Sequence, residues 1–239
     1  MISIDFWDTL VQANTGGEAR NKVRRRALQK VASDHGKTLT PELINAAKKY
    51  AYQQFNNIWL NQQWTPSTED LVSYILDYLQ LPASNREQTF LTTKFEESLW
   101  EGPPQLAEGV DKVIPKLASR YSLALISDTM YSPGRIIQKY LEKIGLDRYF
   151  ASYIFSDEMG FSKPNPKSFR RALAQTKSEA VESWHIGDLI ETDITGAQNV
   201  GMRSILFTGA SDSYKENNSI AAKPDHICSN WVEIEKLLL

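Results

Sequence analysis

Short apolar runs alternate with helical patterns through the carboxy-terminal half of this chain. The runs typical of buried strands lie at 121–127, 152–156, 184–187 and 204–208. Amphipathic helical patterns lie between them at 132–144, 165–175 and 191–200. In the first of these helices, Ser132 and Pro133 mark the start and Gly145 the end. Since parallel neighbours need crossover connections, this order predicts a parallel sheet with helices on both faces.

The amino-terminal half begins with one strand pattern, MISID, and then changes character. From residue 13 to about 104 the pattern is helical throughout, in segments at 18–36, 41–60, 68–81 and 86–100. Gly16-Gly17 precedes this stretch and Gly102-Pro103-Pro104 follows it, and both are turn sequences. We therefore expect a helical bundle over 13–104, inserted into a core made of 1–12 and 105–239.

Composition and charge narrow the class of protein. The 239 residues are 41% hydrophobic, and 27 basic residues against 29 acidic ones give a net charge of -2. Such a balance offers no overall field for nucleic acid or a membrane surface, so we expect neither as a partner. Cys228 alone cannot form an internal disulfide, and no signal sequence or membrane-spanning run is visible. We expect a cytoplasmic protein, monomeric or homodimeric.

Polar residues follow the predicted strands where each strand ends. Asp5 follows the first strand, Ser127-Asp128-Thr129 the second, and Asp188 the strand at 184–187, with Asp193 five residues further on. Lys163 precedes a predicted helix. In an open parallel sheet the ligand site lies outside these strand ends, so the groups should converge.

Carboxylates gathered in one cleft repel one another unless a cation lies between them. Mg²⁺ prefers one or two carboxylates together with water and phosphate oxygens, and Asp5 and Asp188 suit that role. A carboxylate at such a site can attack phosphorus, while Ser127 and Lys163 would stabilise the transferring group. Taken singly, each of these residues is also of a type that is common in turns and helix caps.

Four ordered motifs, DFWDT, LISDT, SKPNP and GDLIETD, resemble those of the haloacid dehalogenase superfamily of hydrolases. The resemblance covers the whole chain and implies an α/β fold, a Rossmann-like parallel sheet core with an inserted α-helical bundle cap. It implies a Mg²⁺-dependent phosphatase that acts on a small phosphorylated metabolite. It also implies roles for individual residues: Asp5 as nucleophile; Asp5, the Trp7 carbonyl and Asp188 as metal ligands, with Asp193 at the metal or supporting Lys163; Ser127 and Lys163 at the phosphoryl group; Thr9, Asp128 and Thr129 on the substrate side.

Two positions depart from the family pattern. Trp7 stands where related phosphatases carry a second Asp, which protonates the leaving group, and indole cannot do this. Asp8 is adjacent, but in an extended backbone it points away from the side shared by residues 5 and 7, and only a turn would bring it inward. Asp128 stands where Asn is frequent. A dehalogenase-type hydrolase, or a weakened binding or regulatory member, therefore remains an alternative to the phosphatase.

Three further features have competing interpretations. Arg20, Lys22, Arg24, Arg25 and Arg26 form a basic run, for which a solvated helix face is favoured over an Arg that reaches a substrate carboxylate or phosphate. The aromatic residues of the bundle are expected mostly in its core, with some lining a pocket. His185 lies within a strand and is expected to be a hydrogen-bonded structural residue rather than a base.

Overall fold

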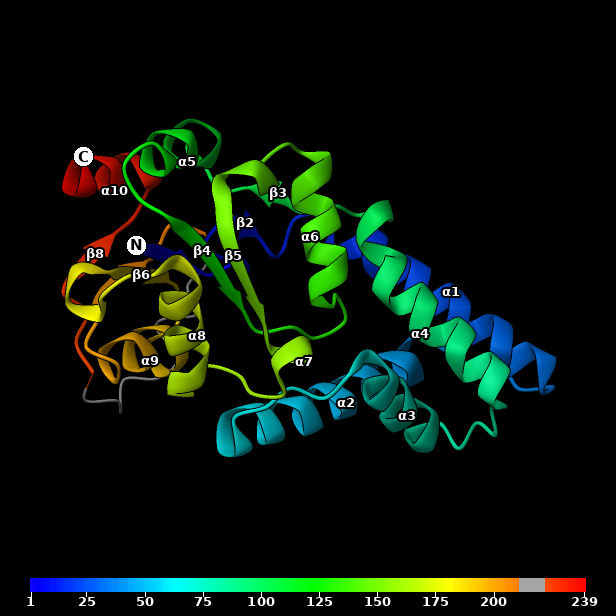
Figure 1. Cartoon of the computed structure of the whole chain (residues 1–239). Coiled ribbons are helices and arrows are strands. Elements are labelled where there is room, and N and C mark those ends of the chain that lie inside the picture. The colour runs from blue at the N-terminus through cyan, green and yellow to red at the C-terminus, as the bar shows by residue number, and fades with distance from the viewer. Residues whose placement is uncertain (211–221) are drawn as a thin grey trace.

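The computed structural model describes residues 1–210 and 222–239. Within these residues, a six-stranded parallel sheet has the order β5-β4-β1-β6-β7-β8 (Figure 1). The strands are β1 (Ile2–Ile4), β4 (Leu123–Ser127), β5 (Phe150–Phe155), β6 (Trp184–Gly187), β7 (Arg203–Phe207) and β8 (His226–Cys228). The predicted α/β fold class is confirmed, with the first strand at the centre of the sheet. The patterns did not predict β8.

Helices cover both faces of the sheet. One face, which includes Ile2 and Ile4, packs on α5 (Val110–Ala118), α6 (Gly134–Lys143) and α10 (Trp231–Leu238). The other face packs on α8 (Pro166–Thr176) and α9 (Thr195–Gln198). Shorter helical segments connect them: α7 (Ser156–Met159), the 3-10 turns η1 (Asp147–Tyr149) and η2 (Ala180–Glu182), and the π-helical turn η3 (Ile190–Ile194). Because side chains alternate along each strand, the second face also buries Ser3, His185 and Ser204.

The helical bundle lies to one side of the sheet and has its own apolar core (Figure 1). It consists of α1 (Gly17–Asp34), α2 (Pro41–Gln62), α3 (Thr68–Tyr78) and α4 (Asn85–Glu101). Capping side chains define three of the starts: Thr40 caps α2, and Ser67 and Ser84 form capping boxes at α3 and α4. All four helices match predicted helical segments. No helix in the described part of the chain is long and apolar enough to span a membrane.

A two-stranded ribbon stands where the chain enters and leaves the bundle. It pairs β2 (Val11–Gln12) with β3 (Gln105–Leu106) in antiparallel register, and the sequence patterns did not predict it. Next to it, Gly16 and Gly102 pack backbone against backbone: Gly16 has φ +69°, and a Cβ there would lie 2.3 Å from the Gly102 carbonyl oxygen. The two predicted turn sequences are therefore neighbours in space.

Candidate active site

A cavity of about 580 Å³ lies between the sheet and the helical bundle. Residues at the strand ends form one wall, and the most polar of them are Asp5, Asp8, Asp128, Lys163, Asp188, Glu191 and Asp193. Helices α1 and α2 form the other wall with Arg20, Arg24, Tyr52, Phe55, Asn56, Trp59 and Leu60. One wall is thus rich in carboxylates, and the opposite one is aromatic and basic.

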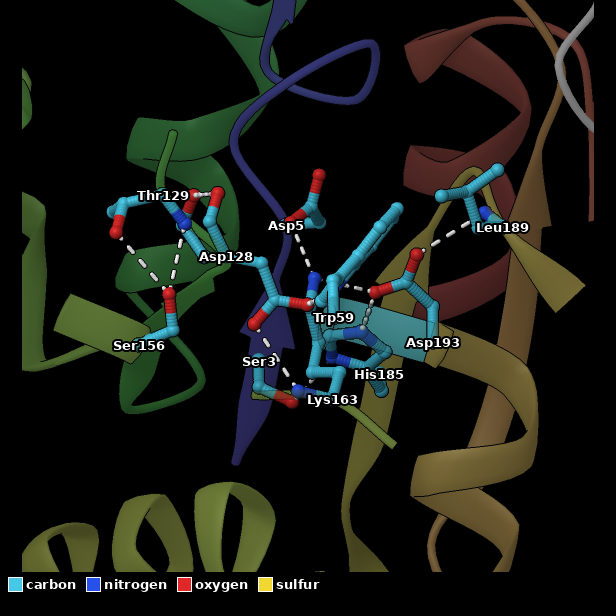
Figure 2. Close-up of polar contacts among 11 residues, drawn as sticks. Ser3, Asp5, Trp59, Asp128, Thr129, Ser156, Lys163, His185, Leu189 and Asp193 are labelled. Carbon is cyan, nitrogen blue, oxygen red and sulfur yellow. Dashed lines mark hydrogen bonds and ion pairs between the residues drawn. The ribbon is translucent and has the colours of Figure 1, made fainter. Parts of the chain in front are cut away.

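Asp5 and Lys163 form a buried ion pair at the end of β1 (Figure 2). The Lys163 ammonium contacts Asp5 Oδ1 and lies 2.7 Å from Asp193 Oδ1, and only 2% of Lys163 is exposed. Burial raises the pKa of Asp5 to about 7, even though the Lys163 charge opposes the shift. Burial alone would lower the pKa of Lys163, but the surrounding carboxylates hold it above its usual value. The site therefore contains more buried negative charge than one ammonium neutralises.

Lys163, His185 and the Leu189 backbone all contact the Asp193 carboxylate. Its Oδ1 lies 2.9 Å from His185 Nε2 as well as beside Lys163, and its Oδ2 accepts a hydrogen bond of 3.1 Å from the Leu189 backbone N–H. The absence of a side chain at Gly187 makes this fit possible, because a Cβ there would lie 2.2 Å from Asp193 Cγ. These contacts favour a role for Asp193 in holding Lys163 over direct contact with a metal.

His185 connects Asp193 to the centre of the sheet. Its Nδ1 lies 2.8 Å from Ser3 Oγ, and burial lowers its pKa, so the ring is neutral (Figure 2). A neutral ring can donate from Nε2 to Asp193 and accept at Nδ1 from the Ser3 hydroxyl, so both ring nitrogens have a partner. This geometry supports the interpretation of His185 as a structural residue.

We expect Asp193→Asn to destabilise the protein by about 3 kcal/mol, because it removes a partner from a buried cation. Although burial opposes it, Lys163 together with the His185 hydrogen bond holds the pKa of Asp193 below its ordinary 3.8. The Asp193 carboxylate therefore stabilises the fold above about pH 3.8, and this stabilisation is lost as the pH falls below that value. Denaturant unfolding at several pH values should show the gap between wild type and variant narrowing under acid. A constant gap would contradict this assignment.

Asp5 and Asp188 follow adjacent strands, since Ile4 and Ile186 are register partners in β1 and β6. Both carboxylates border the cavity, and 5% and 6% of the two residues are exposed. Two hard oxygen donors at neighbouring strand ends fit a Mg²⁺ ion that keeps water and substrate oxygens in its remaining positions. Among the described residues, no group of three or more His, Cys, Asp or Glu side chains could hold a metal.

Asp128 connects the strand-end wall to the bundle. Its Oδ2 accepts a 2.8 Å hydrogen bond from Trp59 Nε1 of α2, and its Oδ1 accepts one of 3.1 Å from the Lys163 backbone N–H. Burial raises the pKa of this carboxyl to about 6. Sequence reasoning placed Asp128 beside the substrate and missed its bond to Trp59, because no local pattern reports a contact between residues so far apart in the chain.

Three other predicted site residues lie behind the cavity wall rather than on it. Ser127 is 1% exposed, and its hydroxyl lies 3.4 Å from the Asp128 carbonyl oxygen. Thr129 is hydrogen-bonded to Ser156 and Asp157, and thereby holds the loop after β4. Thr9 is fully buried, and its hydroxyl has no hydrogen-bond partner within the described residues.

The chain turns immediately after Trp7. Asp8 has φ +52°, and this turn brings it to the cavity beside Asp5 and Trp7. Its Oδ1 accepts a 2.9 Å hydrogen bond from the Ala13 backbone N–H, while burial, the larger effect, raises its pKa. The extended backbone assumed from the sequence is therefore wrong at this position, and Asp8 borders the site.

The basic run is only partly a solvated face. Lys22 and Arg26 are exposed, but 6% of Arg20 and 8% of Arg24 are exposed, and both line the cavity. The solvated-face interpretation is wrong for these two residues. Their spacing of four places them on one side of a helix, which was the signal available in the sequence.

Comparison with known proteins agrees with this geometry. The family described as haloacid dehalogenase-like hydrolase matches residues 34–207. The chain is 30% identical over 218 residues to a glyceraldehyde 3-phosphate phosphatase of Pyrococcus abyssi, covering 87% of this chain and 80% of the relative. It is 26% identical over 217 residues to haloacid dehalogenase-like hydrolase domain-containing protein 3 of Bos taurus, covering 87% and 82%.

Two solved structures share the fold over nearly the whole length. The 2-haloacid dehalogenase of Pseudomonas syringae superimposes with a TM-score of 0.73 at 21% identity, covering 99% of this chain and 96% of that one. The HAD hydrolase YfnB of Bacillus subtilis, bound to magnesium, gives a TM-score of 0.69 at 21% identity, covering 99% and 97%. The resemblance drawn from the four motifs is confirmed: the chain belongs to the haloacid dehalogenase-like hydrolase family.

Proposed function

We propose that this hydrolase is a Mg²⁺-dependent phosphatase that acts on a small phosphorylated metabolite through a phosphoryl group carried on Asp5. The observation that supports it most is the buried Asp5, which borders the cavity together with Lys163 and with Asp188 from the adjacent strand end. Relatives named as phosphatases of glyceraldehyde 3-phosphate and of ribulose 1,5-bisphosphate support the same substrate class.

Each half-reaction of the proposed mechanism is one displacement at phosphorus. An Asp5 carboxylate oxygen attacks phosphorus, the bond from phosphorus to the leaving oxygen breaks, and that oxygen takes a proton. Water then attacks the phosphorus of the aspartyl phosphate, the bond to Asp5 breaks, and inorganic phosphate leaves. Lys163, held by Asp193, balances the charge on the transferring group, and the Ser127 hydroxyl is assigned to the same group after a small movement of its side chain.

Asp5, Asp188 and the Trp7 carbonyl would hold Mg²⁺ in this proposal. When bound, the ion would neutralise phosphate oxygens and the excess carboxylate charge of the site. Such a role is consistent with the two buried carboxylates, Asp5 and Asp193, that share the one ammonium of Lys163.

Residues 13–104 are assigned to a cap, and 1–12 with 105–239 to the catalytic core. The separate apolar core of α1–α4 supports this division. Hydrogen bonds join the cap to the core beside the cavity, from Trp59 Nε1 to Asp128 at 2.8 Å and from the Ser162 N–H to the Gln63 carbonyl at 2.8 Å. A cap in contact with the strand ends would exclude water from the phosphoryl group.

The proposal is tested with aryl phosphates and metabolite phosphates, assayed for phosphate release with and without Mg²⁺. Mg²⁺-dependent release of phosphate is expected. Halide release from 2-haloacids without added metal would instead indicate the dehalogenase-type alternative, and tight binding of a phosphorylated compound without turnover would indicate a regulatory member.

Asp188→Asn should raise the Mg²⁺ concentration needed for half-maximal activity by about 10- to 100-fold, since it removes the charge of one of two ligating carboxylates. A Mg²⁺ titration of phosphatase activity measures this. Asp77→Asn is the matched control, because Asp77 is exposed at the far end of α3 and no described contact links it to the cavity. An unchanged Mg²⁺ requirement in Asp188→Asn would remove Asp188 from the metal site.

A further inference from the structure

Arg24 is a buried cation on the cap wall of the cavity with no counter-ion among the described residues. It is 8% exposed and lines the cavity from α1. Its Nε donates a 3.0 Å hydrogen bond to Ser98 Oγ, and its guanidinium carbon lies 4.5 Å from the centre of the Tyr131 ring. Within the described chain, no carboxylate pairs with it and no acceptor is hydrogen-bonded to its two terminal nitrogens. Those nitrogens are the part of the side chain left for a ligand.

The charge of Arg24 persists in spite of its burial. Burial lowers its pKa to about 10, which leaves the guanidinium protonated at neutral pH. The two other titratable groups that act on it supply no negative charge at neutral pH: Tyr131, whose pKa burial raises to about 12, is then neutral, and Arg20 is cationic. Burying an unpaired charge is costly, and proteins compensate such charges with a partner. A bound anion would supply the partner that this wall lacks.

The same wall contains further unmet hydrogen-bonding capacity. The Tyr131 hydroxyl and Asn56 Oδ1 are both buried without a hydrogen-bond partner in the described structure, and both residues line the cavity. Buried polar atoms without partners are uncommon and costly. A donor, an acceptor and a cation in the lining of one cavity suit an oxygen-rich ligand group.

Arg20, the other buried arginine of α1, is not available in the same way. Its terminal nitrogens donate to the carbonyl oxygens of Ala13, Thr15 and Gly102, where they hold the entry to the bundle. Of the two buried arginines of α1, Arg24 is therefore the one whose terminal nitrogens are uncommitted within the described residues, and the cavity lining also contains the apolar side chains of Phe55 and Met130. One guanidinium with two free nitrogens matches the single charge and two oxygens of a carboxylate, whereas a phosphate dianion would stay undercompensated there.

We infer that the Arg24 wall binds a carboxylate of the substrate, so that this enzyme acts on a phosphorylated carboxylic acid whose phosphate lies at Asp5. The inference rests on the proposed phosphatase function for the position of the phosphate. Arg24 is thus a specificity-determining residue, and Tyr131 and Asn56 contact the carbon carrying the acid or its hydroxyl group.

The test compares 3-phosphoglycerate with glyceraldehyde 3-phosphate, which differ only in a carboxylate against an aldehyde. The wild type should favour the acid in kcat/KM. Arg24→Met should lower that preference by about 10- to 100-fold, which is the usual effect of losing a hydrogen-bonded charge pair. Arg24→Lys should give an intermediate preference, because it keeps the charge and loses the paired donors. Exposed Arg26 of the same helix provides the control, and Arg26→Met should leave the preference unchanged.

Either of two results would overturn the inference. The wild type shows no preference for the acid, or Arg24→Met shows the same preference as the wild type. Hydrolysis of an aryl phosphate separates this failure from failure of the proposed function, since an enzyme active on aryl phosphate without any preference for acids loses only the carboxylate site. If no phosphate ester is hydrolysed, D-glycerate is the probe. It should raise the melting temperature of the wild type most, that of Arg24→Lys less and that of Arg24→Met not at all, and equal shifts in all three would refute the site.

Discussion

Asp5→Asn should reduce kcat by at least about 10³-fold, because an amide of the same size lacks the charge that attacks phosphorus in the first half-reaction, and without that step no aspartyl phosphate forms for the second. Steady-state hydrolysis of an aryl phosphate measures the loss. A rapid acid quench with a radiolabelled substrate provides a second readout: label should appear on the wild-type protein and be absent from the variant.

The Asp5→Asn protein should lose activity and stay folded. A carboxyl whose pKa is raised by burial from 3.8 to about 7 destabilises the folded state as the pH rises through that window, so the neutral amide removes an unfavourable charge. In metal-free protein at neutral pH, the melting temperature of Asp5→Asn should therefore not fall below that of the wild type. Activity near the wild-type level in a folded Asp5→Asn protein would place the nucleophile elsewhere.

The parallel sheet and the residues at its strand ends were predictable, because each strand is encoded by a short local run of apolar residues. β1, β4 and β6 are each short apolar runs, and the chain order of strands and helices fixes where their ends meet. Asp5, Lys163, Asp188 and Asp193 therefore converge as the motifs implied.

The residues that α1 and α2 contribute to the cavity were not predictable, because their burial and their contacts depend on packing between segments far apart in sequence. A run such as RNKVRRR does not reveal which arginine a neighbouring helix will bury, and Arg24 becomes a candidate ligand-binding residue only when Ser98 and Tyr131 lie against it. The same holds for the Trp59–Asp128 bond. Asp8 was expected to point away from the site for a different reason: a single residue with positive φ reverses the alternation on which the strand argument depended, and this is the turn that the sequence left open.

Asp8 and Trp7 lead to the second large expected effect. The turn brings the Asp8 carboxyl to the cavity, and burial raises its pKa, which favours the protonated form that a general acid requires. Trp7 is half-buried, packs edge-on against Phe6 and lies 5.8 Å from the Arg20 guanidinium carbon. Trp7 thus has a packing role, and of these two residues Asp8 is the candidate for proton transfer to the leaving group.

Asp8→Asn should therefore lower kcat/KM for alkyl phosphates by about 10²- to 10⁴-fold, the usual range for general acid–base assistance. Aryl phosphates, whose leaving groups depart without a proton, should lose far less. The Asn side chain keeps an oxygen that can accept the Ala13 hydrogen bond, so the loop should be conserved. The diagnostic quantity is the ratio of alkyl to aryl rates across a series of leaving-group pKa values, because a structural effect on the loop would lower both classes together.

Trp7→Asp distinguishes the two ways in which the departure from the family pattern can act. If no residue supplies the proton in the wild type, alkyl phosphates should already be poor substrates, Asp8→Asn should change little, and Trp7→Asp should restore part of the alkyl rate. If Asp8 supplies it, alkyl phosphates should be good substrates of the wild type, and Trp7→Asp should bring no gain and a less stable loop, since it removes the Phe6 packing. The wild type and both variants could instead hydrolyse alkyl and aryl esters equally well, with the chemical step shown to be rate-limiting. That result would exclude both accounts and indicate that a water molecule protonates the leaving group.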